Sequence, residues 1–436
     1  MGSKGGCRVS KRMLILMVVF VWSVFPAGAT EPESVTARVE SIQLAAVASS
    51  PALQARLHEA AFKGAEARSE AAAINPYVEW QSEGLGSDRT LNAQDSLRVG
   101  TPFNFFGQMG PARDLARTTE EGLVVIQRAA VWSTAVEATR RWLDLAAAME
   151  RLQVRKARLE RLDTALALLE ARHQLGEVAG TEVAQLDLEH TDAASLVAAA
   201  HAQVEGFRQA VAELCGAGYS DPRLGDLKAL AAATRSPDSS EIYHEALAIG
   251  VPMQDANTEA DIEKSRARMA AAAAWGRPLI EAEWEHFPDI GPIQGYDAWG
   301  FRIAVPLPLG SAGARQRAAA REREAFAMAS RQSAARASLS RARAALAVAE
   351  GADARLITVA SAVRDLPRIE ESLFAQFRLG ALTYLEYVYG MVRHDDLLLT
   401  AIDAHADLLL ARLQLSYQLN DPSVFPTAAI STGEDS

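Results

Sequence analysis

Two patterns of hydrophobic and polar positions occur along the chain, and each occurs twice. Short runs in which apolar and polar residues alternate predict β-strands at 77–85, 96–103, 279–286 and 299–305. A long run rich in Ala, Leu, Glu and Arg follows each pair of strands, and this composition favours helix. The pattern therefore predicts a mainly α fold with a small β part, built as a tandem duplication.

The two long helical runs end at a glycine in similar local sequences. Ala-Arg-His-Gln-Leu-Gly ends at Gly176, and Ala-Gln-Phe-Arg-Leu-Gly ends at Gly380. Glu182 and Glu386 each follow six positions later, so both pairs are offset by 204 (380 minus 176 and 386 minus 182). A glycine between two helical runs is the expected C′ residue of a turn. We therefore expect two long helical hairpins whose tips lie at Gly176 and Gly380.

The long runs have few internal breaks. No proline occurs between Pro111 and Gly176, so the first helix should cover residues 112–174. At 1.5 Å per residue it would be about 95 Å long, which is typical of a coiled coil or repeat architecture. Pro367 should kink the second run. The predicted organisation is a signal peptide at 1–29, a first repeat at 30–215, a linker at 216–240, a second repeat at 241–420 and a disordered tail at 421–436.

The first 29 residues have the three parts of a secretory signal. Four basic residues precede an apolar stretch over 13–25, and Ala27-Gly28-Ala29 supplies small residues for cleavage. The alternative is an uncleaved membrane helix, but a span needs roughly 20 apolar residues. We therefore expect export and cleavage of this segment.

Charge and motifs argue against two classes of function. The formal net charge of −11 disfavours a dedicated nucleic-acid-binding protein. The sequence lacks a P-loop, a GxGxxG motif after a strand, and the GxSxG and HExxH motifs. Its two cysteines, Cys7 and Cys215, give neither a disulfide framework nor a zinc spacing. We therefore predict that the protein is not an enzyme and holds no cofactor or metal.

The predicted strands are amphipathic in the manner of transmembrane strands. One face is aromatic and aliphatic, as with Ile280, Ala282 and Trp284, while the other is charged. Four strands cannot close a barrel, so subunits would have to combine, giving eight strands in a dimer or twelve in a trimer. If the apolar face meets lipid, the barrel lumen would be lined by Glu79, Glu83, Arg98, Glu281, Glu283, Glu285 and Arg302.

Taken together, these features resemble the TolC-type outer-membrane efflux factors over essentially the whole mature chain. The resemblance rests on the tandem halves, on the strand pairs before each long helix, and on the Leu-Gly tips with an acid six residues later. Val99-Gly100-Thr101-Pro102 and the run Ala304-Val305-Pro306-Leu307-Pro308-Leu309 are also similar to this family. The Pro-Leu-Pro-Leu run suggests its heavy-metal or cation efflux branch.

The resemblance implies an assembly and its partners. It implies a homotrimer with a 12-stranded transmembrane barrel in outer-membrane lipid and a helical tunnel in the periplasm. The tips would dock onto a periplasmic adaptor (membrane fusion) protein, which connects to an inner-membrane efflux pump of the RND type. The candidate docking residues are Arg172, Leu175, Gly176, Arg378, Leu379 and Gly380.

The resemblance also implies a tunnel mouth just past the second tip, where acidic residues narrow the path. Glu386 matches one such position, and Glu182 is its counterpart in the first half. Tyr389 stands where a second acid is often found, which departs from the family pattern. The alternative function is a trimeric coiled-coil structural protein of the periplasm or surface, or an adaptor. A coiled-coil protein would need sustained heptads and no duplicated strands, and an adaptor would need a lipoyl-like module, which the sequence lacks.

Overall fold

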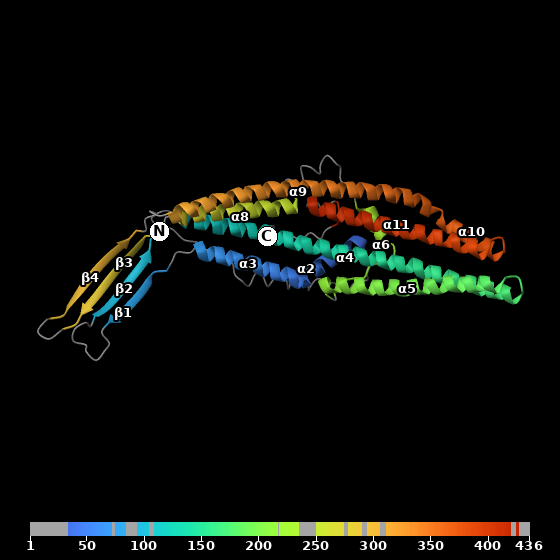
Figure 1. The fold of residues 1–436 in the computed structure, drawn as a ribbon, viewed down its shortest axis with the longest axis horizontal. Coiled ribbons are helices and arrows are strands. Elements are labelled where there is room, and N and C mark those ends of the chain that lie inside the picture. The colour runs from blue at the N-terminus through green and yellow to red at the C-terminus, as the bar shows by residue number, and fades with distance from the viewer. Residues whose placement is uncertain are drawn as a thin grey trace. The chain divides into compact units, whose positions relative to one another are not determined.

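The structure is a computed structural model, and its elements follow the order expected from the sequence (Figure 1). It describes residues 34–71, 75–83, 94–103, 109–216, 218–234, 250–273, 278–289, 294–305, 311–419 and 424–426. The predicted signal peptide lies outside these ranges. The helices are α2 (Val35–Ser49), α3 (Pro51–Ala71), α4 (Met109–Gln174), α5 (Gly180–Cys215), α6 (Asp226–Ala233), α8 (Val251–Ala273), α9 (Ser311–Arg364), α10 (Leu366–Arg378) and α11 (Tyr384–Leu419). The strands are β1 (Tyr77–Glu83), β2 (Gln94–Pro102), β3 (Leu279–Phe287) and β4 (Tyr296–Ala304).

The chain forms two compact units, and each contains segments from both predicted repeats. Unit 1 comprises Met1–Leu53, Val131–Tyr243 and Arg341–Ser436, and unit 2 comprises Gln54–Ala130 and His244–Ser340. Helices α4 and α9 begin in unit 2 and end in unit 1. Among the described helices, none is both long enough and apolar enough to cross a bilayer.

Unit 2 contains one four-stranded antiparallel sheet with the order β1-β2-β3-β4. The register pairs Val78 with Val99, Val99 with Ala282, and Ala282 with Phe301. Residues in register share a face of the sheet. All four predicted strands and their predicted faces are therefore confirmed, although β4 begins three residues earlier than expected.

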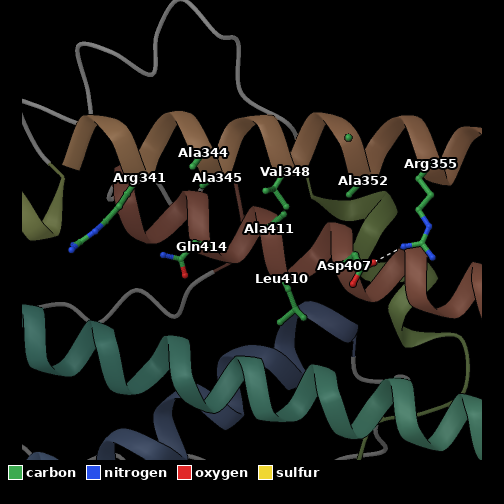
Figure 2. A pocket seen from close by; sticks show the side chains of 11 residues that line it. Arg341, Ala344, Ala345, Val348, Ala352, Arg355, Asp407, Leu410, Ala411 and Gln414 are labelled. Carbon is green, nitrogen blue, oxygen red and sulfur yellow. Dashed lines mark hydrogen bonds and ion pairs between the residues drawn. The ribbon is translucent and has the colours of Figure 1, made fainter. Parts of the chain in front are cut away.

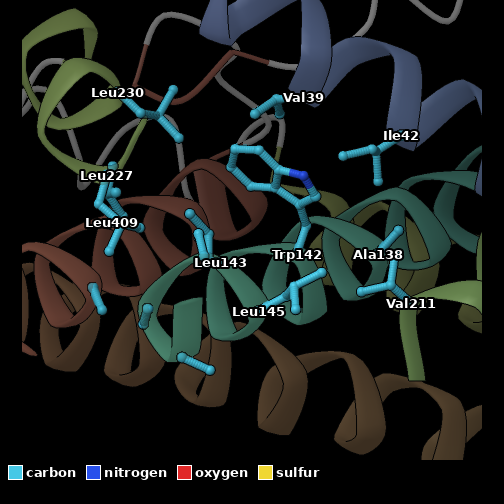
Figure 3. Packing of buried hydrophobic residues seen from close by; sticks show 14 of the residues in the cluster. Val39, Ile42, Ala138, Trp142, Leu143, Leu145, Val211, Leu227, Leu230 and Leu409 are labelled. Atoms are coloured by element: carbon cyan, nitrogen blue, oxygen red, sulfur yellow. The ribbon is translucent and has the colours of Figure 1, made fainter. Parts of the chain in front are cut away.

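The core of unit 1 surrounds Trp142, which is fully buried (Figure 3). Its indole Nε1 donates to the Ser220 carbonyl at 3.3 Å, so its polar atom also has a partner. The hydrophobic cluster draws on α2, α4, α5, α6 and α11. Small alanines such as Ala138 and Ala146 let the helix backbones approach closely, which explains an Ala-rich sequence with few aromatic residues.

The predicted break at Pro367 is confirmed. Another break precedes Pro51, where α2 ends and α3 begins. In the second long run, α9 ends at Arg364 and α10 begins at Leu366, which puts Pro367 in the first turn of α10. Proline is tolerated there because its missing N–H would have no helical partner. Helix α4 continues without a break past Asp163, the matching position of the first half.

The predicted linker contains a helix that sequence analysis missed. α6 lies within 216–240, and its Leu227 and Leu230 are fully buried in the core of unit 1. Asp226 at its start forms a buried ion pair with Arg38 of α2. Arg412 of α11 donates to the Ala231 carbonyl in the last turn of this helix and to the Thr234 carbonyl just after it, at 2.9 Å each. The linker is therefore a structural part of unit 1 where the structure describes it.

The predicted disordered tail also requires a correction. Residues 424–426 are described, and Val424 and Phe425 are 1% and 0% exposed. Gln43 donates to the Pro426 carbonyl at 3.3 Å, which attaches this segment to α2. The prediction of disorder rested on the polar composition after Leu419, and it overlooked these two apolar side chains, which pack into unit 1.

Replacing Phe425 by Ala should destabilise the protein, because it leaves a cavity in the core. The expected cost is about 3–5 kcal/mol. Phe326→Ala is the matched control, since Phe326 is 69% exposed and should change stability little. Thermal unfolding followed by circular dichroism at 222 nm compares the two variants. Equal unfolding temperatures would contradict the packing described for the C-terminal segment.

Candidate functional site

The two hairpin tips have the same backbone structure. In the first, the Glu177 N–H donates to the Arg172 carbonyl at 3.0 Å and the Gly176 N–H to the His173 carbonyl at 2.9 Å. In the second, the N–H groups of residues 381 and 380 donate in the same pattern, at 2.9 and 3.0 Å. This pair of bonds is the Schellman motif that ends a helix. Both predicted turns are confirmed at the predicted glycines.

Each tip needs glycine because its φ angle is positive. Gly176 has φ +79° and Gly380 has φ +74°, a left-handed conformation that costs other residues energy. The leucine before each glycine projects outward, with Leu175 76% and Leu379 78% exposed. The same turn therefore presents one solvent-exposed leucine at the end of each hairpin.

Arg172 joins the two tips to each other. Its Nη2 donates to the Arg378 carbonyl at 2.6 Å, and its guanidinium lies against Gly380. The Arg378 side chain is exposed. The two arginines predicted as docking residues therefore differ, since Arg172 connects the hairpins within the chain whereas Arg378 faces solvent. Figure 1 shows both tips at the same end of unit 1.

The tunnel-mouth candidate Glu386 closes a capping box at the start of α11. The Thr383 N–H and hydroxyl both donate to Glu386 Oε2 at 2.9 Å, and the Glu386 N–H donates to Thr383 Oγ1 at 3.3 Å. These donors lower the pKa of the Glu386 carboxyl. In the first hairpin Ala179 stands at the cap and offers no side-chain bond, so Glu182 has no matching role in a cap.

The remaining residues near the tips lie on the same two return helices. Glu182 is half-buried in the first turn of α5, and Tyr389 is 73% exposed on α11. The Tyr384 hydroxyl donates to Gln185, which brings the starts of α11 and α5 together. The structure thus places all three tunnel-mouth candidates close behind the tips, with Glu386 held by its own helix terminus.

A charged cluster behind the tips was not found from the sequence. Arg161 of α4 pairs with Glu370 of α10 at 2.9 Å and with the buried Asp395 of α11. His394, 4% exposed, lies 3.1 Å from Asp395 and 3.6 Å from Glu370. The cluster connects the first hairpin to the second. In the sequence only the adjacent His394 and Asp395 of α11 are visible, and their partners come from distant segments.

The sheet brings all seven predicted lumen residues onto one face. Arg98 lies between Glu79 and Glu283, at 3.3 and 2.6 Å from their carboxylates. Glu281 pairs with Arg302 at 3.4 Å and accepts the Tyr77 hydroxyl. Five glutamates and two arginines on this face sum to −3 per chain (2 minus 5). The arginines therefore hold the glutamate array together and leave it net negative.

The opposite face of the sheet is exposed and apolar along most of its length, with Asp95, His286 and Asp297 at one end. Trp80, Trp299 and Phe301 are 74%, 78% and 69% exposed. A contiguous apolar surface of this kind marks contact with a membrane or with another protein. Strands β1 and β4 form the edges of the sheet and have no further strand partner among the described residues. Unpaired edges and a bare apolar face are both features that assembly would cover.

Metal-ligating side chains do not cluster among the described residues, and the cysteine that the structure describes is buried. The described residues contain no group of three or more His, Cys, Asp or Glu side chains that could hold a metal ion. Cys215 is buried, and burial raises the pKa of its thiol to about 11, so it is protonated at neutral pH.

The comparisons with known proteins identify the fold. No family model matches the chain, and a comparison with curated proteins gives no match either. A solved structure of CusC, described for its folding and transmembrane channel formation, has a TM-score of 0.69 at 14% identity and covers 91% of this chain and 95% of that one. The CmeC outer membrane channel of Campylobacter jejuni gives a TM-score of 0.68 at 12% identity, covering 92% and 91%. The outer membrane protein VceC of Vibrio cholerae gives 0.66 at 15% identity, covering 89% and 98%.

Exchanging the glycine of the first tip should loosen its turn. Gly176→Ala places a Cβ in open space, so the expected cost is the left-handed backbone alone, about 1–2 kcal/mol. Amide hydrogen exchange at Glu177 should then accelerate roughly 5- to 30-fold. Gly176→Asn is the control, because Asn tolerates this conformation better. Equal exchange in the wild type and both variants would contradict the role of glycine here.

The start of α11 should loosen in acid. The pKa of Glu386 is lowered from its ordinary 4.5, so its capping contribution is complete above that value and is lost as the pH falls through the lower folded pKa. Thr383 amide exchange, expressed relative to Glu386→Gln at each pH, should accelerate across this window. Glu386→Gln keeps an acceptor oxygen without the titration. A pH-independent ratio would contradict the capping box.

Proposed function

We propose that this chain, which has the fold of outer-membrane channels, is a TolC-type outer-membrane efflux channel. The observation that carries the proposal is the open four-stranded sheet, with one exposed apolar face and one charged face. Three copies would close it into a 12-stranded barrel, with Trp80, Trp299 and Phe301 against lipid and the glutamates around a water-filled lumen. Both unpaired edges and the bare apolar face would then be covered.

Charge supports this orientation of the strands. Turning the sheet over would place Glu281, Glu283 and Glu285 in hydrocarbon, where ionisable groups are strongly disfavoured. It would also leave a row of aromatic side chains in water. A soluble coiled-coil structural protein gives no reason for strands with this division of faces.

The proposed assembly extends from the outer membrane into the periplasm. The signal sequence at 1–29 would direct export, and the hairpin tips would dock onto a periplasmic adaptor connected to an inner-membrane pump of the RND type. The exposed Leu175 and Leu379 and the exposed Arg378 side chain suit such a contact, because apolar side chains beside a cation make a compact recognition surface. The channel would conduct passively, since transport through an open path needs no bond chemistry. We place it in the heavy-metal or cation efflux branch on the Pro-Leu-Pro-Leu run.

Conduction across planar bilayers tests the function. The net charge on the lumen face is −3 per chain, or −9 in a trimer (three times −3). Fixed negative charge raises the local cation concentration, so we expect mild cation selectivity at low salt. The preference should weaken as salt rises, because the Debye length shortens to about 8 Å at physiological ionic strength.

The control separates the barrel from the tip. Replacing Glu281, Glu283 and Glu285 together by Gln should reduce the selectivity measured from reversal potentials. Glu386→Gln should leave this dependence on the three glutamates in place. Anion preference of the wild type at low salt would refute the lumen assignment, and a protein that neither conducts nor forms trimers would refute the channel.

A further inference from the structure

Two aromatic rings meet on the charged face of the sheet, at the end where the chain passes from β3 to β4. Phe287, the last residue of β3, is in register with Tyr296, the first residue of β4. Their ring centroids lie 4.7 Å apart with 19° between the planes, so the rings are stacked. Tyr296 remains 60% exposed. Because side chains alternate between faces, Phe287 shares its face with Glu281, Glu283 and Glu285.

Contact with lipid does not explain aromatic side chains on this face. In the proposed barrel the opposite face, with Trp80 and Trp299, meets the membrane, and the aromatic girdles of such barrels face outward as well. Phe287 and Tyr296 would instead face the water of the lumen, where stacking covers only part of each ring. Ligand sites are typically lined by aromatic side chains together with a few placed polar groups. The neighbouring polar groups therefore decide whether this pair can bind a ligand.

The carboxylate nearest to the aromatic pair on β3 has no ion-pair partner. Each of the other two glutamates of β3 pairs with an arginine, at 2.6 Å to Arg98 and at 3.4 Å to Arg302. No ion pair among the residues that the structure describes includes Glu285. Glu285 lies two residues before Phe287, which is about 7 Å at 3.4 Å per residue. A negative charge without a cation thus lies beside an exposed aromatic surface.

Short side chains flank this carboxylate. Glu285 is in register with Ser96 on β2 and with Ala298 on β4. Neither side chain is long enough to cover a glutamate beside it. Ala298 also follows Tyr296 on the same face of β4, so Tyr296 and Glu285 are diagonal neighbours across the two strands. Diagonal neighbours are about 7–8 Å apart, a distance that one planar ring can span.

We propose that Phe287, Tyr296 and Glu285 form a binding site for a flat aromatic cation on the lumen face. The ring of the ligand would stack on Tyr296, and its positive charge would lie beside the Glu285 carboxylate. An aromatic face attracts cations through its quadrupole, and the carboxylate repels aromatic anions. The inference rests on the proposed function and deepens it, because it names a class of molecule that the lumen would bind.

The groove between α9 and α11 in unit 1 does not suit such a ligand. Its volume is about 650 Å³, and Figure 2 shows small apolar side chains along it with the Arg355–Asp407 ion pair (2.7 Å) at one end. None of its described lining residues is aromatic. Arg341 and Arg355 outnumber the single aspartate, so the groove repels cations. A flat cation should therefore prefer the sheet.

Binding of ethidium, a flat aromatic cation, to the purified full-length protein in detergent tests the site by fluorescence anisotropy. Tyr296→Leu removes the exposed ring and should weaken binding roughly 2- to 5-fold. Tyr296→Phe keeps the ring and should bind ethidium as the wild type does. Phe287→Leu removes the partner ring and should act in the same direction as Tyr296→Leu, which supplies a second variant.

The matched control is Trp299→Leu. Trp299 lies three residues after Tyr296 on the same strand (299 minus 296), faces the opposite side of the sheet and is 78% exposed. Its replacement also removes an exposed ring, but from the face that would meet lipid. Binding of ethidium should therefore be unchanged.

Block of the current in planar bilayers separates recognition of the ring from recognition of the charge. Ethidium should block the wild type at a lower concentration than tetraethylammonium, a cation without an aromatic ring. Glu285→Gln should raise the blocking concentration of both cations, whereas Tyr296→Leu should raise that of ethidium alone. Glu386→Gln, at the tip, should leave the effect of Tyr296→Leu in place. The flat anion 1-pyrenesulfonate should not block.

The outcomes distinguish this site from the channel itself. A protein that conducts as a trimer, yet binds ethidium equally well as wild type, Tyr296→Leu and Glu285→Gln, would overturn the site and leave the proposed function standing. Equal weakening by Trp299→Leu and Tyr296→Leu would overturn the site as well. A protein that neither conducts nor forms trimers would overturn the proposed function.

Discussion

The structure depends on one constraint, which is the exposed apolar face of the four-stranded sheet. Pairing between strands and burial of side chains offset the free-energy cost of ordering a strand. In this sheet the edge strands β1 and β4 are paired on one side only among the described residues, and most side chains of the aromatic face are exposed. Within one chain, only the charged face has stabilising side-chain contacts of this kind, because Arg98 and Arg302 form ion pairs with glutamates on neighbouring strands. An amphipathic sheet with this division is stable only where apolar solvent or protein covers one side and water the other.

The helical part follows a different physical logic. Unit 1 relies on alanine-lined helix contacts around Trp142 and on ion pairs that cross between the hairpins, such as Arg161 with Asp395. Arg172 ties the two tips together through the Arg378 carbonyl. These links hold the two hairpins of one chain side by side.

Much of the fold could be predicted because its signals are local. The period-two alternation of Ile280, Ala282 and Trp284 against three glutamates specified a strand and both of its faces. The glycines at the tips predicted turns with positive φ angles, and Pro367 predicted a break in the helix. Each of these features is decided by a few neighbouring residues, so one sequence is enough to find it.

What the sequence did not reveal depends on distant partners. Helix α6 was concealed by prolines and glycines around it, although Leu227 and Leu230 are spaced to share one helix face. Phe425 follows a polar stretch and is buried only because the core of unit 1 accepts it. Nothing in the sequence distinguishes Arg172, which bonds the second tip, from Arg378, whose side chain stays in solvent. Tertiary contacts assign these roles.

The most direct test of the central claim is the environment of the aromatic face. The wild type and a variant with Trp80, Trp284 and Trp299 replaced by Phe can be reconstituted into vesicles of ordinary or brominated phosphatidylcholine, and the difference between their fluorescence reports these three tryptophans. The account predicts strong fluorescence quenching by the bromine atoms in the lipid tails and weak quenching by acrylamide in the water. Strong quenching by acrylamide with none by brominated lipid would contradict it.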